Sequence, residues 1–129
     1  MHKLLLPMIV ILTTALASGC NSAKSPAAVA TDVATARQQA STEVTDTRKD
    51  AAKHVDSAAA DGSSKGLNDA TARAGYDVAV AQADGDHNVA IQQCSAQTGE
   101  AQKSCKERAD AAYDQAKTHA NVTRLSSLQ

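Results

Sequence analysis

The chain has 129 residues, with 13 Lys and Arg against 14 Asp and Glu, a net charge of −1, and neither Phe nor Trp. Charges of both signs are interspersed, so nothing in them favours binding to nucleic acid or anionic lipid. Although 43% of residues are hydrophobic, most of those after residue 19 are Ala, which buries little surface. This inventory argues against a multi-layered core. Because Ala is the best helix former, the composition instead predicts an all-α protein of long, thin helices.

The first residues have the pattern of an export signal. A short positive start, "MHK", is followed by an uncharged apolar run over residues 4–16. That run is shorter than the ~20 residues that a membrane-spanning helix needs, and it contains Pro7. A basic start and an apolar segment of this length are typical of a secretory signal peptide. We therefore expect residues 1–19 to be removed.

Two cleavage sites compete. Ala15-Leu16-Ala17 fits ordinary signal peptidase, which would cut after Ala17 and leave a soluble periplasmic or secreted protein. Alternatively, "ASGC", residues 17–20, resembles a bacterial lipobox, with Ala17 where that pattern usually has Leu. The resemblance implies that Cys20 becomes the first mature residue and carries lipid on its sulfur and its amine. With Asn21 next, it also implies anchoring to the periplasmic face of the outer membrane in a Gram-negative cell.

The number of cysteines favours the lipobox. Lipidation of Cys20 leaves Cys94 and Cys105 free to pair with each other. Cleavage after Ala17 would leave three cysteines, an odd number, in an oxidising compartment. The mature chain of about 110 residues is long enough for one small domain.

Residues 20–25 are a polar tether, and a long helix is predicted over residues 26–60. Ser25 fits an N-cap, and Pro26 suits the first helical position. Apolar residues then recur at steps of four and three. They are Val29, Val33, Ala36, Ala40, Val44, Thr47, Ala51, Val55 and Ala58. This stripe is narrow, so the helix needs a partner or frays.

A flexible linker is predicted at residues 61–66, "DGSSKG", because two glycines and two serines break the helical pattern. A second helix is expected from about Leu67 to Gln97. Its stripe comprises Tyr76, Val80, Ala83, His87, Ile91 and Cys94. Gly75 and Asp84-Gly85 weaken the pattern, so a break near Gly85 is the alternative to a continuous helix.

The third helix is expected from Glu100 to about Asn121, with a frayed end, and Gly99 would supply a left-handed cap before it. Its predicted stripe is Ala101, Cys105, Ala109, Ala112, Ala116 and Ala120. An antiparallel turn at residues 99–100 places Cys94 opposite Cys105 and His87 opposite Ala112. Such a hairpin, over residues 67–129, can bring two Cα atoms within the ~4.4–6.8 Å that a disulfide needs. We therefore predict a Cys94–Cys105 disulfide that staples the hairpin.

This segment resembles Ala-rich, Cys-paired segments in secreted proteins of Gram-negative bacteria. The matching positions are Cys94, Gly99, Cys105, Tyr113 and Ala116-Lys117. No activity is established for that group, so the resemblance implies architecture alone. Two alternatives for the cysteines stay open. A redox-active pair would usually be C-x-x-C, and a metal site would require His87 or His119 to approach Cys94.

No catalytic motif is found. Phosphate-binding, dinucleotide-binding and G-x-S-x-G patterns are missing from the sequence, and the carboxylates are scattered along helices. We expect no enzyme activity, cofactor, metal or small-molecule substrate. The favoured function is a lipid-anchored spacer, scaffold or interaction module, with a protein partner at the first helix or the hairpin. The alternative is a stress protectant, because the 11-residue spacing of the long helix resembles that of desiccation-protein repeats.

Overall fold

The computed structural model describes residues 22–129, which form three α-helices. These are α1 (Pro26–Ala60), α2 (Ser64–Cys94) and α3 (Gly99–Ser126). Residues 22–129 contain no strand, so the predicted all-α class is confirmed. The predicted signal peptide, residues 1–19, and the predicted lipidation site, Cys20, lie outside the described residues.

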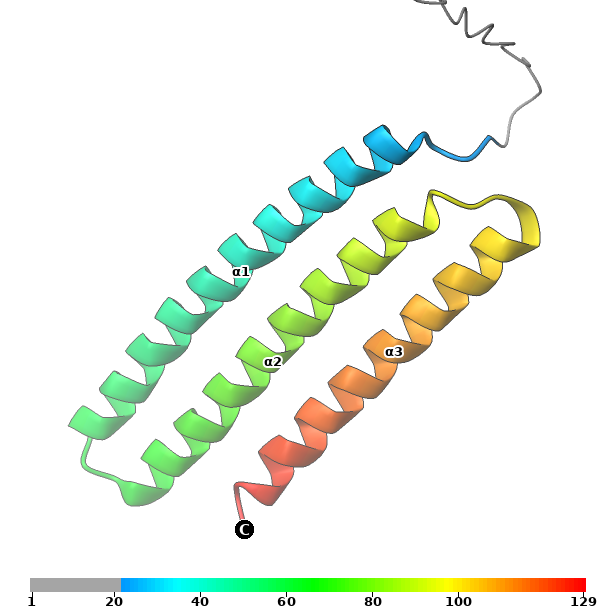
Figure 1. The fold of residues 1–129 in the computed structure, drawn as a ribbon. Helices are drawn as coiled ribbons and strands as arrows, with labels where there is room; N and C mark the ends of the chain where they lie inside the picture. Colours follow the sequence, from blue (N-terminus) through cyan, green and yellow to red (C-terminus); the bar gives the residue numbers. More distant parts are fainter. Residues whose placement is uncertain (1–21) are drawn as a thin grey trace, which may run out of the picture.

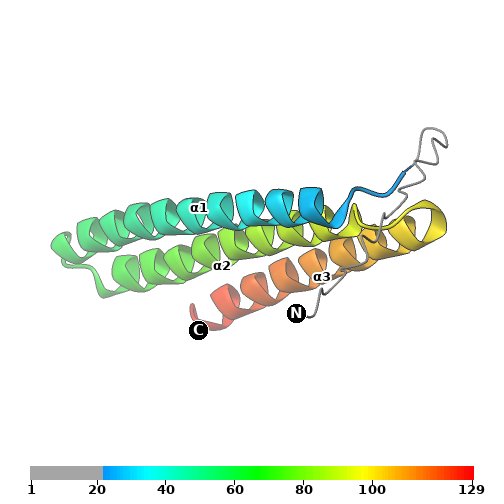
Figure 2. The ribbon, with the colours of Figure 1, turned by 45° about the horizontal axis from the view of Figure 1, so that its top comes forward.

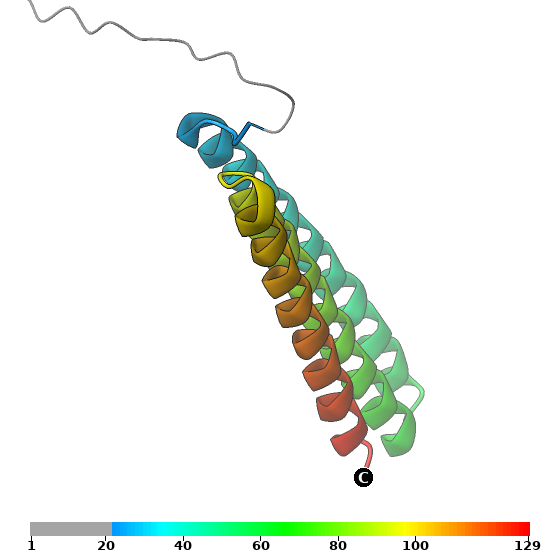
Figure 3. The same ribbon diagram turned by 90° about the vertical axis from the view of Figure 1, so that its right-hand side faces the viewer.

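The three helices form a single layer. Figure 1 shows them side by side, with α2 in the middle and neighbouring helices antiparallel. Viewed from the edge, the helices lie one behind another (Figure 3). Within residues 22–129, α1 and α3 each contact α2 but do not contact each other. The layer is therefore open, and only α2 is covered on two sides.

Helix α1 follows its predicted bounds. The Ser25 hydroxyl accepts a hydrogen bond from the Ala28 N–H at 3.3 Å, and Pro26 occupies the first turn. All nine residues of the predicted stripe are buried or half-buried, whereas most other α1 residues are exposed. Helix α1 contacts α2, and Figure 2 shows the two helices running side by side. The partner that this narrow stripe requires is thus supplied within the chain.

The connection between α1 and α2 is shorter than the six-residue linker predicted. Only Asp61, Gly62 and Ser63 lie between the helices, and Gly62 has a φ of 70°, which favours glycine. The Ser63 hydroxyl accepts from the Gly66 N–H at 3.2 Å, so the helix begins three residues before Leu67. A capping hydroxyl outweighs the poor helix propensity of the nearby glycine.

Helix α2 is continuous, as the favoured prediction had it. Neither Gly75 nor Gly85 interrupts it. A glycine inside a helix costs about 1 kcal/mol, which packing on two sides can offset. The helix ends at Cys94, three residues earlier than expected.

Helix α3 differs from the prediction at both ends and on its face. It begins at Gly99, which has a φ of 58°. This left-handed glycine is therefore the first residue of α3 and does not cap α2. The helix also continues to Ser126, where fraying had been predicted. Three predicted stripe alanines, Ala101, Ala112 and Ala116, are exposed. Longer side chains replace them against α2, namely Gln102, Tyr113, Lys117 and Arg124.

The core is thin. Apart from Val33 and Cys94, the buried hydrophobic residues among those described are all alanine. They are Ala36, Ala51, Ala72, Ala81, Ala83, Ala109 and Ala120. Because each alanine buries little surface, the layer depends on close helix contact and on the polar and covalent links described next.

Candidate functional site

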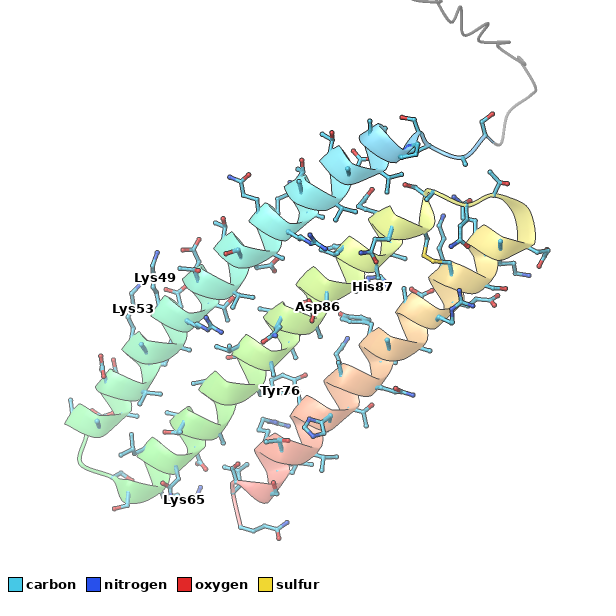
Figure 4. All side chains as sticks on the ribbon, in the orientation of Figure 1. Lys49, Lys53, Lys65, Tyr76, Asp86 and His87 are labelled. Carbon is cyan, nitrogen blue, oxygen red and sulfur yellow. A yellow bond between two sulfur atoms is a disulfide. The ribbon has the colours of Figure 1, made fainter. Side chains whose placement is uncertain are left out.

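The two seams of the layer are built differently. The seam between α1 and α2 brings backbones close together at Gly85. A Cβ added to Gly85 would lie 2.5 Å from Ala40 Cβ and 3.3 Å from Ala40 Cα. Only glycine fits there, so this contact fixes the register of the two helices. The seam between α2 and α3 carries a disulfide and a series of polar and aromatic contacts (Figure 4).

The disulfide joins Cys94, the last residue of α2, to Cys105, in the second turn of α3. Their Cα atoms are 5.6 Å apart, inside the predicted range. Cys94 is only 1% exposed, and the Gln102 side-chain amide donates to its carbonyl oxygen at 3.4 Å. The bond therefore lies at the end of the layer where α2 turns into α3.

A cluster around Tyr113 forms the middle of this seam. The Tyr113 hydroxyl donates a hydrogen bond to Asp84 Oδ1, and the Lys117 ammonium lies 4.7 Å from the centre of the Tyr113 ring. The hydrogen bond to Asp84 raises the pKa of the Tyr113 phenol, because ionisation would place two negative oxygens together, while Lys117 partly opposes the rise. The hydrogen bond with Tyr113 raises the pKa of Lys117. A protonated phenol of this kind is a donor that holds two helices together.

His87 extends this cluster toward the disulfide. Its Nε2 lies 2.7 Å from Asp110 Oδ1, and its ring centre is 5.0 Å from that of Tyr113. Figure 4 shows the His87 side chain pointing from α2 toward α3. His87 therefore meets the turn of α3 that contains Ala112, through Asp110 and Tyr113, while Ala112 itself is exposed.

Tyr76 and Arg124 close the other end of the seam. The Arg124 guanidinium lies 5.2 Å from the Tyr76 ring centre and donates to Asn121 Oδ1 at 2.9 Å. Arg124 Nε is buried and makes no hydrogen bond within residues 22–129. A cation above an aromatic face stabilises this contact by roughly 0.5–1 kcal/mol at exposed sites.

The sequence-predicted site residues separate into three groups. Cys20 lies outside the described residues, whereas Cys94 and Cys105 are joined. His87 and His119 are not brought together, because His119 lines a groove with Gly75 and Ala79 nearer the far end of α2. Across residues 22–129, no three His, Cys, Asp or Glu side chains are grouped so that they could hold a metal ion.

Sequence reasoning missed Asp84, Asp110 and the hydrogen-bonding role of Tyr113. The predicted pairing of α2 with α3 could have identified them. Asp84 lies one turn before His87, and Asp110 lies one turn before Tyr113, so all four residues fall on the facing turns. The arrangement offers hydrogen bonds and ion pairs between helices.

The start of the described chain is fastened to the same end as the disulfide. The Lys24 N–H donates to the Ser95 carbonyl oxygen at 2.9 Å, and Lys24 Nζ pairs with Asp32 at 2.7 Å. In Figure 1 the entering segment runs beside the connection between α2 and α3, while the C-terminus and the turn between α1 and α2 lie at the opposite end. We call the end that contains Lys24 and the disulfide the tether end, and the opposite end, with the C-terminus, the distal end.

Comparisons with models of protein families, with curated proteins and with solved structures find no match to this chain. None of α1, α2 and α3 has a stretch apolar and long enough to span a lipid bilayer.

Proposed function

We propose that this protein is a non-catalytic, lipid-anchored protein of the cell envelope that acts as a spacer, scaffold or interaction module in the periplasm. The observation that carries the proposal is the tether end. The resemblance of residues 17–20 to a lipobox places the lipid on Cys20, and Lys24, four residues later, is bonded to the loop after α2. Four residues reach at most about 14 Å, so the tether end would lie close to the outer membrane.

The length of the layer supports the role of a spacer. Helix α1 has 35 residues, which corresponds to about 52 Å at 1.5 Å per residue. A layer anchored through Cys20 at its tether end would present the turn between α1 and α2, and the C-terminus, at the far end. The exposed Val122, Leu125 and Leu128 lie toward that end, where a partner could reach them.

We also propose that the Cys94–Cys105 disulfide staples the hairpin of α2 and α3. The seam beside it contains few apolar groups, so packing competes weakly with chain entropy. Closing a loop of this size contributes roughly 3 kcal/mol in the chain-entropy model. A bond of this kind suits the oxidising periplasm.

The alternative is a hydrophilic stress protectant. A protectant helix would order only on dehydration, whereas the packing face of α1 lies against α2, and Ala40 of α1 lies against Gly85 of α2, where no larger residue fits. These contacts favour the spacer or interaction module.

Fractionation of a Gram-negative envelope tests the proposal. The wild-type protein should sediment with the outer membrane, whereas Cys20→Ala should remain unprocessed or move to the soluble fraction. Cys94→Ser/Cys105→Ser is the matched control, because it changes two cysteines without touching the anchor, and it should stay with the membrane. Soluble wild-type protein in the periplasm would refute the anchored spacer.

A further inference from the structure

One broad face of the layer has two open grooves. Asp86, on α2, lines the groove between α1 and α2 and also the groove between α2 and α3. Both grooves must therefore open on the same side of α2. Gly75, Ala79 and Ala90 lie on this side too, since they are separated from Asp86 by eleven, seven and four residues, which are helical repeats. We call this surface the groove face, and it comprises α2 residues 75, 79, 82, 86 and 90 with the walls of the two grooves.

The groove face is lined mainly by small side chains. The groove between α2 and α3 is walled by alanines, which are Ala83, Ala90, Ala109, Ala112 and Ala116. Figure 1 shows α1 and α3 running beside α2 without crossing it, so no helix of residues 22–129 covers this groove. Small side chains let a second set of helices approach closely.

Two opposite charges in this face are unpaired. Arg48 of α1 and Asp86 of α2 line the same groove. Neither forms a hydrogen bond or an ion pair with any other residue between 22 and 129. By contrast, Lys49 and Lys53 of α1 pair with acidic residues one turn away, and Figure 4 shows them on the outer edge of the layer.

The groove face is large enough for a stable interface. Helix α2 has 31 residues and is about 47 Å long. Two interhelical spacings of about 8–10 Å each give the face an area of roughly 750–950 Å². A standard interface buries about 800 Å² on each partner.

The register of α1 and α2 indicates how two copies would fit. Since Ala40 faces Gly85 and the helices are antiparallel, Arg48 lies level with Asp77. This level is nine residues from Asp86, about 13 Å along the axis. Consider a two-fold axis that lies between the two stacked layers, runs at right angles to the helices, and sits midway between these two levels. This axis brings Arg48 of each copy beside Asp86 of the other. An axis parallel to the helices would instead place Asp86 opposite itself, and like charges repel.

We propose that two copies of this chain associate through their groove faces in an antiparallel arrangement, with Arg48 of each copy paired to Asp86 of the other. An isologous interface of this type contains each pair twice, so one unpaired arginine and one unpaired aspartate on each copy are satisfied together. The proposal does not depend on lipidation. Because the copies are antiparallel, the dimer would have the N-terminal tether of one copy at each end. It would therefore link two N-terminal anchors.

Charge reversal with mixing tests this pairing. The full chain is extracted and purified in detergent after its free thiols are alkylated, and its association is measured by sedimentation velocity. Arg48→Glu alone places two acidic groups together at both contacts, and Asp86→Arg alone places two arginines together. Each variant should show a dissociation constant raised by about tenfold or more. An equimolar mixture of the two restores an opposite-charge pair at both contacts, so it should form a heterodimer close to wild-type affinity.

A second pair of variants tests the face itself. Ala79→Arg places a bulky charge on the groove face, and Asn88→Arg, nine residues away on α2, places the same charge on the opposite side. Both positions are exposed, so both variants should keep wild-type helicity by circular dichroism. Ala79→Arg should abolish the dimer and Asn88→Arg should not. A wild-type chain that stays monomeric at ~100 μM, where even a weak interface would be populated, would overturn the proposal. A mixture of Arg48→Glu and Asp86→Arg that associates no more tightly than either variant alone would also overturn it. So would equal effects of Ala79→Arg and Asn88→Arg on the dimer.

Discussion

Gly85 is the position at which a single methyl group should distinguish close helix packing from loose contact. In Gly85→Ala the new Cβ would lie 2.5 Å from Ala40 Cβ, whereas carbon atoms in contact prefer about 3.5–4.0 Å. Helices α1 and α2 would have to separate by about 1 Å. Overpacking of this kind costs about 1–3 kcal/mol.

Gly75→Ala is the matched control, because it makes the same change in the same helix. A Cβ added to Gly75 meets nothing within 4 Å. Both variants gain about 0.8–1.0 kcal/mol from the better helix propensity of alanine. In dilute, monomeric protein the two variants should therefore differ by the overpacking cost alone. Gly75→Ala should be more stable than wild type, and Gly85→Ala should be about 1–3 kcal/mol less stable than Gly75→Ala.

Urea denaturation of the oxidised protein, followed by circular dichroism at 222 nm, measures this difference. Ala40→Gly in the Gly85→Ala background removes the opposing methyl group, so the double-mutant cycle should show a favourable coupling of about 1–2 kcal/mol. If Gly85→Ala were as stable as Gly75→Ala, the close approach of α1 and α2 described above would be incorrect.

Three further predictions concern the seams. Reduction of the disulfide, or Cys94→Ser/Cys105→Ser, should lower stability by roughly 2–4 kcal/mol in thermal melts, and a melt indifferent to reductant would show that packing alone holds the hairpin. The raised pKa of Tyr113 means that its contribution to stability is complete below its unfolded value of 10.0 and is lost as pH rises through the higher native value. Wild type should therefore lose more stability than Tyr113→Phe between pH 9 and pH 11, and parallel curves would contradict the Asp84 contact. Amide exchange should be as slow in the middle of α1 as in α2, because α1 packs along α2; fast exchange throughout α1 would mean that it frays.

Some of this architecture was readable from the sequence. Ser25-Pro26 fixed the start of α1, and steps of four and three identified its packing face without error. The pairing of Cys94 with Cys105 followed from their placement on either side of Gly99. These signals are strong because a cap, a disulfide and a regular apolar stripe each act over a short stretch of chain.

The packing of α1 on α2 was not predicted, because the face of α2 that receives α1 hardly differs from its surroundings. That face includes Ala74, Ala81 and Gly85, residues so small that they give little hydrophobic contrast. Close contact there depends on the absence of side chains, which apolar periodicity does not detect. The predicted alanine stripe of α3 failed for a related reason. Tyr113 and Lys117 gain partners on or beside α2, so the helix turns them inward and leaves Ala112 and Ala116 exposed.

The central claim is that the chain is anchored by lipid at Cys20, and intact mass measurement of the protein from a Gram-negative envelope tests it most directly. The account predicts a mature chain that begins at Cys20, carries added acyl mass, and is two hydrogens lighter than the reduced form because Cys94 and Cys105 are joined. A mature chain that begins at Ser18 and carries no lipid would contradict it.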